Sequence, residues 1–378
     1  MTIKILHCIN DLIPAGAEFA LKRLIVNSNA NDLQHAVIVL TGLNEGQNIL
    51  SDLDIPVYQL HLNRRLPSPF ALLKIKQIIR EEKPDLLHTW LYAGILAGSL
   101  AAWKSGIPIV WGLHHADLDP QHQKKMTAWT MKACARLSHS IPTTIIACGE
   151  SVRQNHIAFR FDAKKIVVIP NGIDTKLFKP DPSAPAELKK ELGLDNEVKL
   201  VGIASRFHPI KDHANFLQAA AIVAEQRADI HFVLCGNEIT SENAALVQII
   251  RQSGLENKCH LLGRRKDMPK ILAAWDVAVS SSRSEALSNA LIEAMACGTP
   301  CVATDVGDTA FIIGDFGVTV PAQNAEKLAG GILKLMTLEP EALHAVKQGT
   351  RKRIISNFDM RIISAETGKL YKKILENS

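Results

Sequence analysis

The stretch Val277-Ala-Val-Ser-Ser-Ser-Arg-Ser-Glu285-Ala-Leu-Ser-Asn-Ala-Leu-Ile-Glu293-Ala-Met-Ala-Cys-Gly298-Thr-Pro300 joins an apolar run, a polar loop and a helical segment. Residues 277–280 predict a short buried strand, and the helix predicted over residues 289–296 ends before Gly298, a residue type that commonly ends helices. A second apolar run follows at residues 300–304. Strand, helix and strand in this order predict a β-α-β unit of a parallel sheet covered by helices on both faces.

The same alternation runs along all 378 residues and places the chain in the α/β class. Apolar runs typical of further strands lie at residues 3–9, 36–40, 86–89, 109–111, 144–148, 199–204 and 231–235. Helical segments lie at residues 17–27, 71–82, 94–104, 124–139, 212–226 and 243–253, and residues 339–378 also favour helices. With 47% hydrophobic residues, the chain is long enough to form two cores.

A proline-rich segment, Pro180-Asp-Pro-Ser-Ala-Pro185, predicts a linker because proline continues neither a helix nor a central strand. We therefore expect two domains, residues 1–180 and residues 181–358. Residues 359–378 either end the second domain or pack back on the first. Two such domains joined by a hinge predict a cleft between the carboxyl ends of their strands, where ligands of parallel sheets usually bind.

The composition of the chain indicates where the protein is located and which partners are excluded. No run reaches the roughly 18 apolar residues of a transmembrane helix, and residues 1–10 contain no leader-like apolar stretch, so we expect a mature cytosolic chain. The seven cysteines are scattered without a C-x-x-C pair, which predicts reduced thiols and neither disulfides nor a zinc site. The net charge of +5 is too small to indicate nucleic acid. Residues 1–180 hold 20 Lys and Arg against 14 Asp and Glu, so the basic excess lies in the first half.

Two carboxylates flank a predicted anion site in the opening stretch. Ser288 or Asn289 can cap the helix, and the first backbone N–H groups, up to Leu291, form with the helix dipole a site of the kind that binds phosphate. Glu285 on the loop and Glu293 on the helix would repel an anion unless they hold neutral hydroxyls beside it. A sugar and a ribose supply such hydroxyls.

Two cations occupy a second loop. In Gly202-Ile-Ala-Ser-Arg206-Phe-His-Pro-Ile-Lys211, Arg206 and Lys211 follow a predicted strand and precede a predicted helix. From that loop they could converge on a diphosphate, whose two charges suit two cations.

Six motifs occur in one order along the chain. They are a glycine-containing loop at residues 14–18, a histidine-bearing strand end at 110–117, Ile-Pro-Asn-Gly-Ile-Asp at 169–174, the loop from Ser205 to Lys211, a loop at 263–269, and Glu285 to Glu293. In this order and spacing they resemble the retaining family 4 glycosyltransferases of the GT-B fold, and among them the bacterial envelope and capsular polysaccharide enzymes. The resemblance covers nearly the whole chain and implies two Rossmann-like domains that face each other across a cleft.

The resemblance implies a role for each matching residue. Glu285 would hold hydroxyls of the transferred sugar, Glu293 the ribose hydroxyls, and Arg206 with Lys211 the diphosphate. The loop residue Ser205 would also belong to the donor site. Backbone amides would complete the phosphate site at Gly16, Ser288, Asn289, Ala290 and Leu291.

Two further matches concern the ends of the donor. Arg265 would contact the base largely through its main chain. His115, the better match of two neighbouring histidines, would lie near the anomeric centre or the 6-hydroxyl of the sugar, and we group it with Glu285, Arg206 and Lys211 as the catalytic set.

The resemblance also implies the reaction. Retention in this family is usually ascribed to front-face attack in which the leaving phosphate takes the acceptor proton, so neither a nucleophilic carboxylate nor a divalent metal nor another cofactor is expected. Binding and charge stabilisation then supply the catalysis. We expect a hexose to move from a nucleotide diphosphate sugar, a UDP-sugar such as UDP-glucose, to a saccharide or lipid-linked saccharide in the assembly of envelope polysaccharide.

Two other functions stay open. A UDP-sugar 2-epimerase of the same fold would hold the nucleotide similarly but needs no acceptor, and a non-catalytic nucleotide-sugar-binding protein would bind without turnover. An oxidoreductase is disfavoured because no G-x-G-x-x-G follows the first strand of either half.

A basic stripe predicts one more partner. At helical spacing Lys125, Trp129, Lys132 and Arg136 share one face of the helix predicted over residues 124–139. A tryptophan among cations suits an anionic membrane surface, although a solvated helix face with one exposed tryptophan is the simpler alternative. We therefore expect a cytoplasmic protein whose first domain docks on the inner leaflet.

Overall fold

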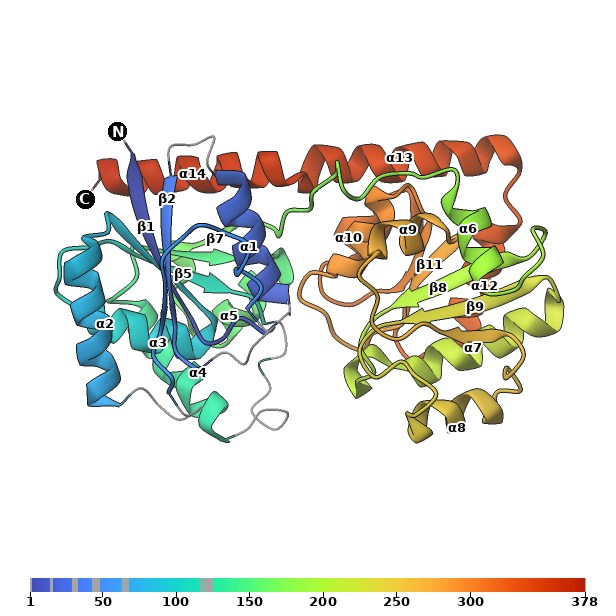
Figure 1. Ribbon diagram of the computed structural model, residues 1–378, viewed down its shortest axis with the longest axis horizontal. Helices are drawn as coiled ribbons and strands as arrows, with labels where there is room; N and C mark the ends of the chain where they lie inside the picture. Colours follow the sequence, from blue (N-terminus) through green and yellow to red (C-terminus); the bar gives the residue numbers. More distant parts are fainter. Residues whose placement is uncertain are drawn as a thin grey trace. The chain divides into compact units, whose positions relative to one another are not determined.

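The computed structural model describes residues 2–13, 16–28, 33–42, 48–62, 68–115, 118 and 125–377 (Figure 1). The chain divides into two compact units, one of Met1–Gly172 with Met360–Ser378 and the other of Ile173–Asp359. Each unit contains one sheet covered by helices, and every strand pair described in these sheets is parallel. The predicted α/β class with parallel sheets is confirmed.

The sheet of the first unit has the strand order β3-β2-β1-β4-β5-β6-β7, so the order reverses between β1 and β4. Its strands are β1 (Ile3–Ile9), β2 (Leu33–Val39), β3 (Val57–Gln59), β4 (Leu86–Trp90), β5 (Ile109–Leu113), β6 (Thr144–Ala147) and β7 (Ile166–Val168). Its helices are α1 (Gly16–Ser28), α2 (Pro69–Glu82), α3 (Leu91–Ala102), α4 (Lys125–Ser138), α5 (Glu150–Ala158) and α14 (Met360–Glu376).

The sheet of the second unit has the order β10-β9-β8-β11-β12-β13, which reverses between β8 and β11. Its strands are β8 (Lys199–Ala204), β9 (Ile230–Cys235), β10 (Cys259–Leu261), β11 (Val277–Ser280), β12 (Cys301–Thr304) and β13 (Gly317–Val320). Its helices are α6 (Ala184–Glu191), α7 (His213–Gln226), α8 (Ala244–Gln252), α9 (Met268–Ala273), α10 (Asn289–Ala296), α11 (Thr309–Ile313), α12 (Ala325–Met336) and α13 (Pro340–Phe358).

The passage from the first unit to the second differs from the expected linker. The chain crosses between Gly172 and Ile173, before the proline-rich segment. Pro185 lies in the first turn of α6, where the missing N–H of a proline leaves no helical hydrogen bond unmade. The segment from Pro180 to Pro185 is therefore part of the second unit and leads into a helix.

The C-terminal helix α14 belongs to the first unit, where it packs beside α1. The hydroxyl of Tyr371 lies 2.7 Å from Nδ1 of His88 in β4. A glycine at position 172 permits the close approach of this helix, because a Cβ there would lie 2.4 Å from Sδ of Met360. The last helix of the chain thus completes the core of the first unit.

A chain of buried polar side chains crosses the first sheet. Trp90 Nε1 can only donate and lies 3.1 Å from His7 Nδ1, so that nitrogen accepts. Neutral His7 then carries its proton on Nε2, 2.9 Å from His35 Nδ1, and neutral His35 carries its proton on Nε2, 2.5 Å from Ser28 Oγ. Ser28 in turn donates to the carbonyl of Ile25 at 2.8 Å. Every link has one donor and one acceptor only when both imidazoles are neutral.

Burial keeps these imidazoles neutral. It lowers the pKa of His35 to about 4 and holds the pKa of His7 well below its ordinary value, where His35 and His88 add to the effect. Burial likewise lowers the pKa of His88 well below that value. Unfolding returns each pKa to about 6.5. Below that pH the unfolded chain binds more protons than the folded one, so acid favours unfolding.

We expect the first unit to lose stability as the pH falls from 7 to 5. Each histidine that stays neutral in the fold contributes a slope of up to about 1.4 kcal/mol per pH unit below its unfolded pKa. Urea unfolding followed by tryptophan fluorescence reports mainly this unit, which holds Trp90, Trp103, Trp111 and Trp129 of the five tryptophans.

The matched variant is His35→Gln, whose amide accepts and donates in the same places without titrating. It should reduce the slope by about one such increment. An unchanged slope would contradict the role given to His35.

Candidate active site

The predicted phosphate-binding loops of the second unit meet at the carboxyl ends of β8 and β11. These strands pair in parallel, with Val277 opposite Val201, and the strand order reverses between them. Open α/β sheets commonly bind ligands at such a reversal, because the loops that leave the two strands diverge there. The loop after β8 carries Arg206 and Lys211, and the loop after β11 carries Glu285.

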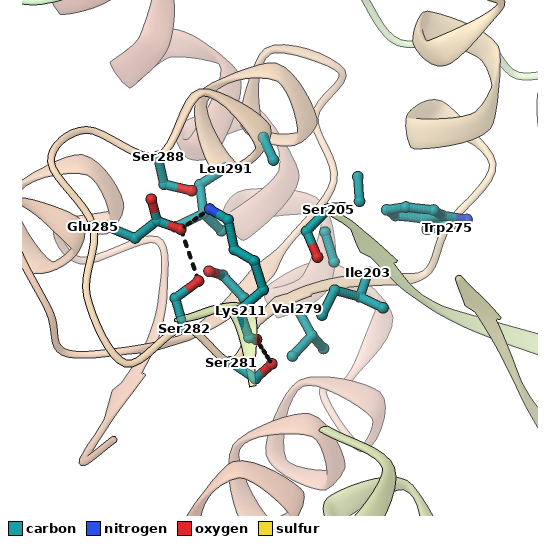
Figure 2. Close-up of a pocket in the computed structure, with 14 residues that line it drawn as sticks. Ile203, Ser205, Lys211, Trp275, Val279, Ser281, Ser282, Glu285, Ser288 and Leu291 are labelled. Atoms are coloured by element: carbon teal, nitrogen blue, oxygen red, sulfur yellow. Dashed lines mark hydrogen bonds and ion pairs between the residues drawn. The ribbon is translucent and has the colours of Figure 1, made fainter. Parts of the chain in front are cut away.

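A pocket lies between these loops (Figure 2). Its wall combines the ends of β8 and β11, the first turn of α10 and the indole of Trp275. Gly202 in β8 makes room for that indole, since a Cβ would lie 2.0 Å from its ring. The predicted residues that line the pocket are Ser205, Lys211, Glu285, Ser288, Ala290 and Leu291.

An ion pair joins the two loops inside the pocket. Lys211 Nζ lies 2.5 Å from Glu285 Oε1, and the Ser282 hydroxyl donates to the same oxygen at 2.7 Å (Figure 2). Both charged side chains are largely covered, with 23% and 11% of their surface exposed. A lysine ammonium has three donors, so Lys211 keeps two for another acceptor. Oε2 of Glu285 forms no hydrogen bond with the residues that the structure describes, and it can accept from a ligand hydroxyl.

The first turn of α10 supplies backbone donors beside this ion pair. Ser288 precedes the helix in an extended conformation and does not cap it with its side chain. The first helical hydrogen bond runs from the Ile292 N–H to the Ser288 carbonyl at 3.2 Å. Ala290 and Leu291, whose amides precede that bond, line the pocket, and the helix dipole favours an anion there.

The remaining predicted residues of the second unit lie outside the pocket wall. Arg206 is exposed, and its side chain forms no hydrogen bond or ion pair with a described residue. Asn289 and Glu293 are half-buried on α10, one turn apart. Arg265 forms a two-bond fork with Asp267, at 2.8 and 2.7 Å, and also pairs with Glu191. Its hydrogen bonds to Asp267 and then Glu191 raise the pKa of Arg265.

Two predicted residues belong to the first unit. Gly16 begins α1, and residues 14 and 15 of its loop lie outside the described residues. His115 follows β5 and is exposed, and its ring stacks on Tyr92 with 5.4 Å between centroids. The Tyr92 hydroxyl lies 2.8 Å from His156 Nε2, and His156 Nδ1 donates to the Val152 carbonyl at 2.7 Å. A hydrogen-bonded chain thus orients the ring against which His115 packs.

Several residues that line or support the pocket were not predicted from the sequence. Ser281 and Ser282 line the pocket, and their position directly after a predicted strand was a usable signal. Trp275, which lies just before β11, also lines the pocket, and no motif pointed to it. Gly307 approaches from the loop after β12, with φ of 57°, and a Cβ there would lie 2.1 Å from the Glu285 carbonyl oxygen.

Sequence models of two families match the chain in succession. The family described as "Glycosyltransferase Family 4" matches residues 16–177, and the family described as "Glycosyl transferases group 1" matches residues 185–353. The two matches together span most of the chain, and they cover the strands from β2 to β7 and from β8 to β13. The chain therefore belongs to the family 4 glycosyltransferases of the GT-B fold, and the predicted resemblance is confirmed.

Named relatives and solved structures agree with this assignment. An Escherichia coli UDP-Gal:alpha-D-GlcNAc-diphosphoundecaprenol alpha-1,3-galactosyltransferase is 25% identical over 77% of this chain and 76% of its own length. The Campylobacter jejuni N,N'-diacetylbacillosaminyl-diphospho-undecaprenol alpha-1,3-N-acetylgalactosaminyltransferase is 25% identical over 96% of this chain and 98% of its own. HepE of Anabaena, solved in complex with UDP-glucose, has the same fold, with a TM-score of 0.83 at 23% identity over 98% of this chain and 100% of its own.

We expect Gly307→Ala to destabilise the second unit more than Gly193→Ala. Both glycines have positive φ, 57° and 68°, so both alanines meet the left-handed strain of roughly 1 kcal/mol. Only the alanine at 307 must also displace the Glu285 loop, because nothing lies within 4 Å of a Cβ at Gly193. Denaturant unfolding should show an additional loss of about 2 kcal/mol for Gly307→Ala. Equal losses in the two variants would mean that the loop at Glu285 moves away freely.

Proposed function

We propose that this glycosyltransferase moves a hexose, with retention of configuration, from a UDP-sugar such as UDP-glucose to a lipid-linked saccharide. The observation that carries the proposal is the Lys211–Glu285 ion pair beside the first turn of α10. A cation, a carboxylate and free helical amides in one pocket suit a ligand that joins a diphosphate to hydroxyl-bearing rings.

The diphosphate would lie against the positive end of α10. Lys211 keeps its bond to Glu285 and turns its two remaining donors to phosphate oxygens, while the amides of Ala290 and Leu291 bind from the helix. Arg206 would swing from solvent onto the same anion. These groups stabilise the charge that grows on the diphosphate as it leaves.

The carboxylates of Glu285 and Glu293 would accept hydrogen bonds from the hydroxyls of the donor. Glu285 Oε2 would accept from the transferred sugar, and Glu293, further along α10, would hold the ribose. Arg265 has its guanidinium paired with Asp267 and Glu191, so its loop would meet the base through the main chain. From the first unit, Gly16 would offer an amide to phosphate and His115 would lie near the anomeric centre.

The chemistry would need no side-chain nucleophile. The acceptor hydroxyl attacks the anomeric carbon on the face from which the diphosphate departs, the glycosidic C–O bond forms as the sugar–phosphate C–O bond breaks, and the leaving phosphate oxygen takes the hydroxyl proton. Positioning and charge stabilisation by Lys211 and Arg206 are the contribution of the protein. We propose that these cations replace a divalent metal in this role.

The names of the relatives support the donor and the acceptor. The Escherichia coli relative is named for UDP-Gal, and both it and the Campylobacter jejuni relative are named for diphospho-undecaprenol-linked acceptors and alpha-1,3 linkages. We therefore place this chain in the assembly of a lipid-linked envelope polysaccharide, on the cytoplasmic side of the membrane.

We expect UDP-sugars to raise the unfolding temperature of the protein and to be turned over in the presence of a lipid-linked saccharide. Lys211→Ala should lower kcat by about a hundredfold, because one donor to the leaving group is worth about 3 kcal/mol. Thermal shift against UDP-, GDP- and ADP-sugars, with and without EDTA, identifies the donor and tests the metal.

Product analysis separates the alternatives. Sugar transferred with retained configuration supports the proposal. An epimerised UDP-sugar formed from donor alone would indicate a 2-epimerase, and binding without any turnover would indicate a sensor. No stabilisation by any nucleotide sugar would overturn the donor assignment.

The basic stripe on α4 supports a membrane partner. Lys125, Trp129, Lys132 and Arg136 are all exposed, with 53% of Trp129 accessible, whereas Met131 and Cys134 on the opposite face are buried. No helix in the described part of the chain has both the length and the apolarity needed to cross a bilayer. We propose that α4 binds the anionic surface of the inner leaflet.

We expect Trp129→Ala with Lys132→Glu to reduce binding to vesicles that contain anionic lipid by about tenfold, since the double change removes an exposed indole and reverses a positive charge. The matched control is Trp103→Ala with Lys104→Glu. Trp103 is 52% exposed with the Lys104 ammonium 5.7 Å from its ring centroid, and it lies beyond the end of α3. Equal vesicle binding by both double variants and by the unchanged protein would contradict the proposal that α4 binds the membrane.

A further inference from the structure

Four contacts hold the loop after β8 against the loop after β11. One is the Lys211–Glu285 ion pair itself. A second is a backbone hydrogen bond of 2.8 Å from the Arg283 N–H to the Ile210 carbonyl. A third is the Ser281 hydroxyl, which lies 2.8 Å from the Lys211 carbonyl oxygen and 3.0 Å from that of Asp212. The fourth joins the side chains of Arg283 and Asp212.

The Arg283–Asp212 contact is a two-bond fork. Arg283 Nε donates to Asp212 Oδ2 at 2.7 Å, and its Nη2 donates to Oδ1 at 3.1 Å. The Asp212 side chain is 4% exposed and that of Arg283 is 50% exposed. A buried carboxylate needs a charged or hydrogen-bonding partner, and here the fork is that partner. The pair therefore fixes a surface arginine onto a buried point of the opposite loop.

Asp212 occupies a backbone position that favours glycine. Its φ of 49° and ψ of 54° lie in the left-handed region, where aspartate is tolerated better than most side chains. It directly follows Lys211 and precedes α7, and its Oδ1 also accepts from the Asn215 N–H at 3.4 Å. The carboxylate thus ties the end of the Lys211 loop both to α7 and to the Glu285 loop.

A bound donor would add bonds to both members of the ion pair that joins the loops. Phosphate oxygens would accept from the two remaining donors of Lys211, and a sugar hydroxyl would donate to Glu285 Oε2. Arg283 and Asp212 do not line the pocket. Their fork can therefore keep the spacing of the two loops while Lys211 and Glu285 engage the donor.

We infer that Asp212 and Arg283 form a positioning pair that sets Lys211 against Glu285 and keeps both at the donor throughout the reaction. The inference rests on the proposed function for its catalytic consequence, and on the loop contacts alone for its structural one. Neither residue lines the pocket. Their effect passes through Lys211.

The structural consequence is tested without any ligand, by hydrogen exchange. In Arg283→Ala the amides of Lys211, Asp212 and Arg283, which bond to the carbonyls of His208, Pro209 and Ile210, should exchange at least about tenfold faster. Asp212→Asn keeps tolerance of the left-handed backbone and an oxygen for the Asn215 amide. It removes the charge and places an NH2 donor opposite Arg283 Nε, which breaks the fork. It should show the same acceleration. Unchanged exchange in both variants would overturn the inference.

The matched control is Arg227→Ala. Arg227 forms the same kind of fork with Asp229, at 2.8 and 2.6 Å, in the same unit and after the end of α7, away from the pocket. Its removal should leave the exchange of the Lys211 loop unchanged. If Arg227→Ala accelerates that exchange as much as Arg283→Ala does, the effect is general loosening and the inference fails.

The catalytic consequence is tested by a double-mutant cycle. Arg283→Ala should lower kcat about tenfold through displacement of Lys211, with little change in KM, and Arg283→Lys should restore part of it. In a Lys211→Ala background the same change should cost less than about twofold, because the group it positions is gone. Equal costs in the two backgrounds would show that Arg283 does not act through Lys211. If no nucleotide sugar binds the unchanged protein, the proposed function fails, while the exchange result still decides the role of the pair.

Discussion

The Lys211–Glu285 ion pair forms only if the loop after β8 and the loop after β11 lie against each other. The four central strands of the second sheet, β9, β8, β11 and β12, hold the loops in this arrangement. Parallel pairing of β8 with β11 fixes where both loops begin. A glycine in each of the neighbouring loops allows a close backbone contact with a site loop. A Cβ on Gly236, after β9, would lie 2.0 Å from the Ser205 carbonyl oxygen, and one on Gly307, after β12, would lie 2.1 Å from the Glu285 carbonyl oxygen. Because glycine has no side chain, the loops after β9 and β12 can contact the two site loops. The ion pair is thus a property of four adjacent strands.

The strands that could be predicted from the sequence are mostly interior ones. β8 and β11 are continuous apolar runs because helices cover both faces of the sheet. The strands that the apolar pattern missed, β3, β7, β10 and β13, are the edges of the two sheets, three or four residues long and only partly buried. An edge strand pairs on one side only, so its short, half-exposed sequence resembles a loop. The linker predicted at the proline-rich segment, residues 180–185, differs from the structure for another reason. A proline that cannot continue a helix can still begin one, as Pro185 does in α6.

The two charged residues that line the pocket, Lys211 and Glu285, could be predicted because each lies in a loop that follows a strand. Their partners could not be predicted. Lys211 and Glu285 are 74 positions apart, and Asp212 and Arg283 are 71 apart. These pairings depend on β8 lying beside β11, which is a property of strand order and not of either loop. Arg265 shows the same limit, since the resemblance implied a main-chain contact with the base, and no pattern indicated that its guanidinium pairs with Glu191 and Asp267.

The structure contains two kinds of buried polar network. In the first unit, His7 and His35 are neutral and linked to Trp90 and Ser28, so this network buries no charge. In the second unit, Lys211 with Glu285 and Arg283 with Asp212 keep charges that are paired. The neutral network uses its donors and acceptors internally, whereas Lys211 keeps two donors for another acceptor. The charged network is therefore the one suited to stabilise negative charge that grows on a departing diphosphate.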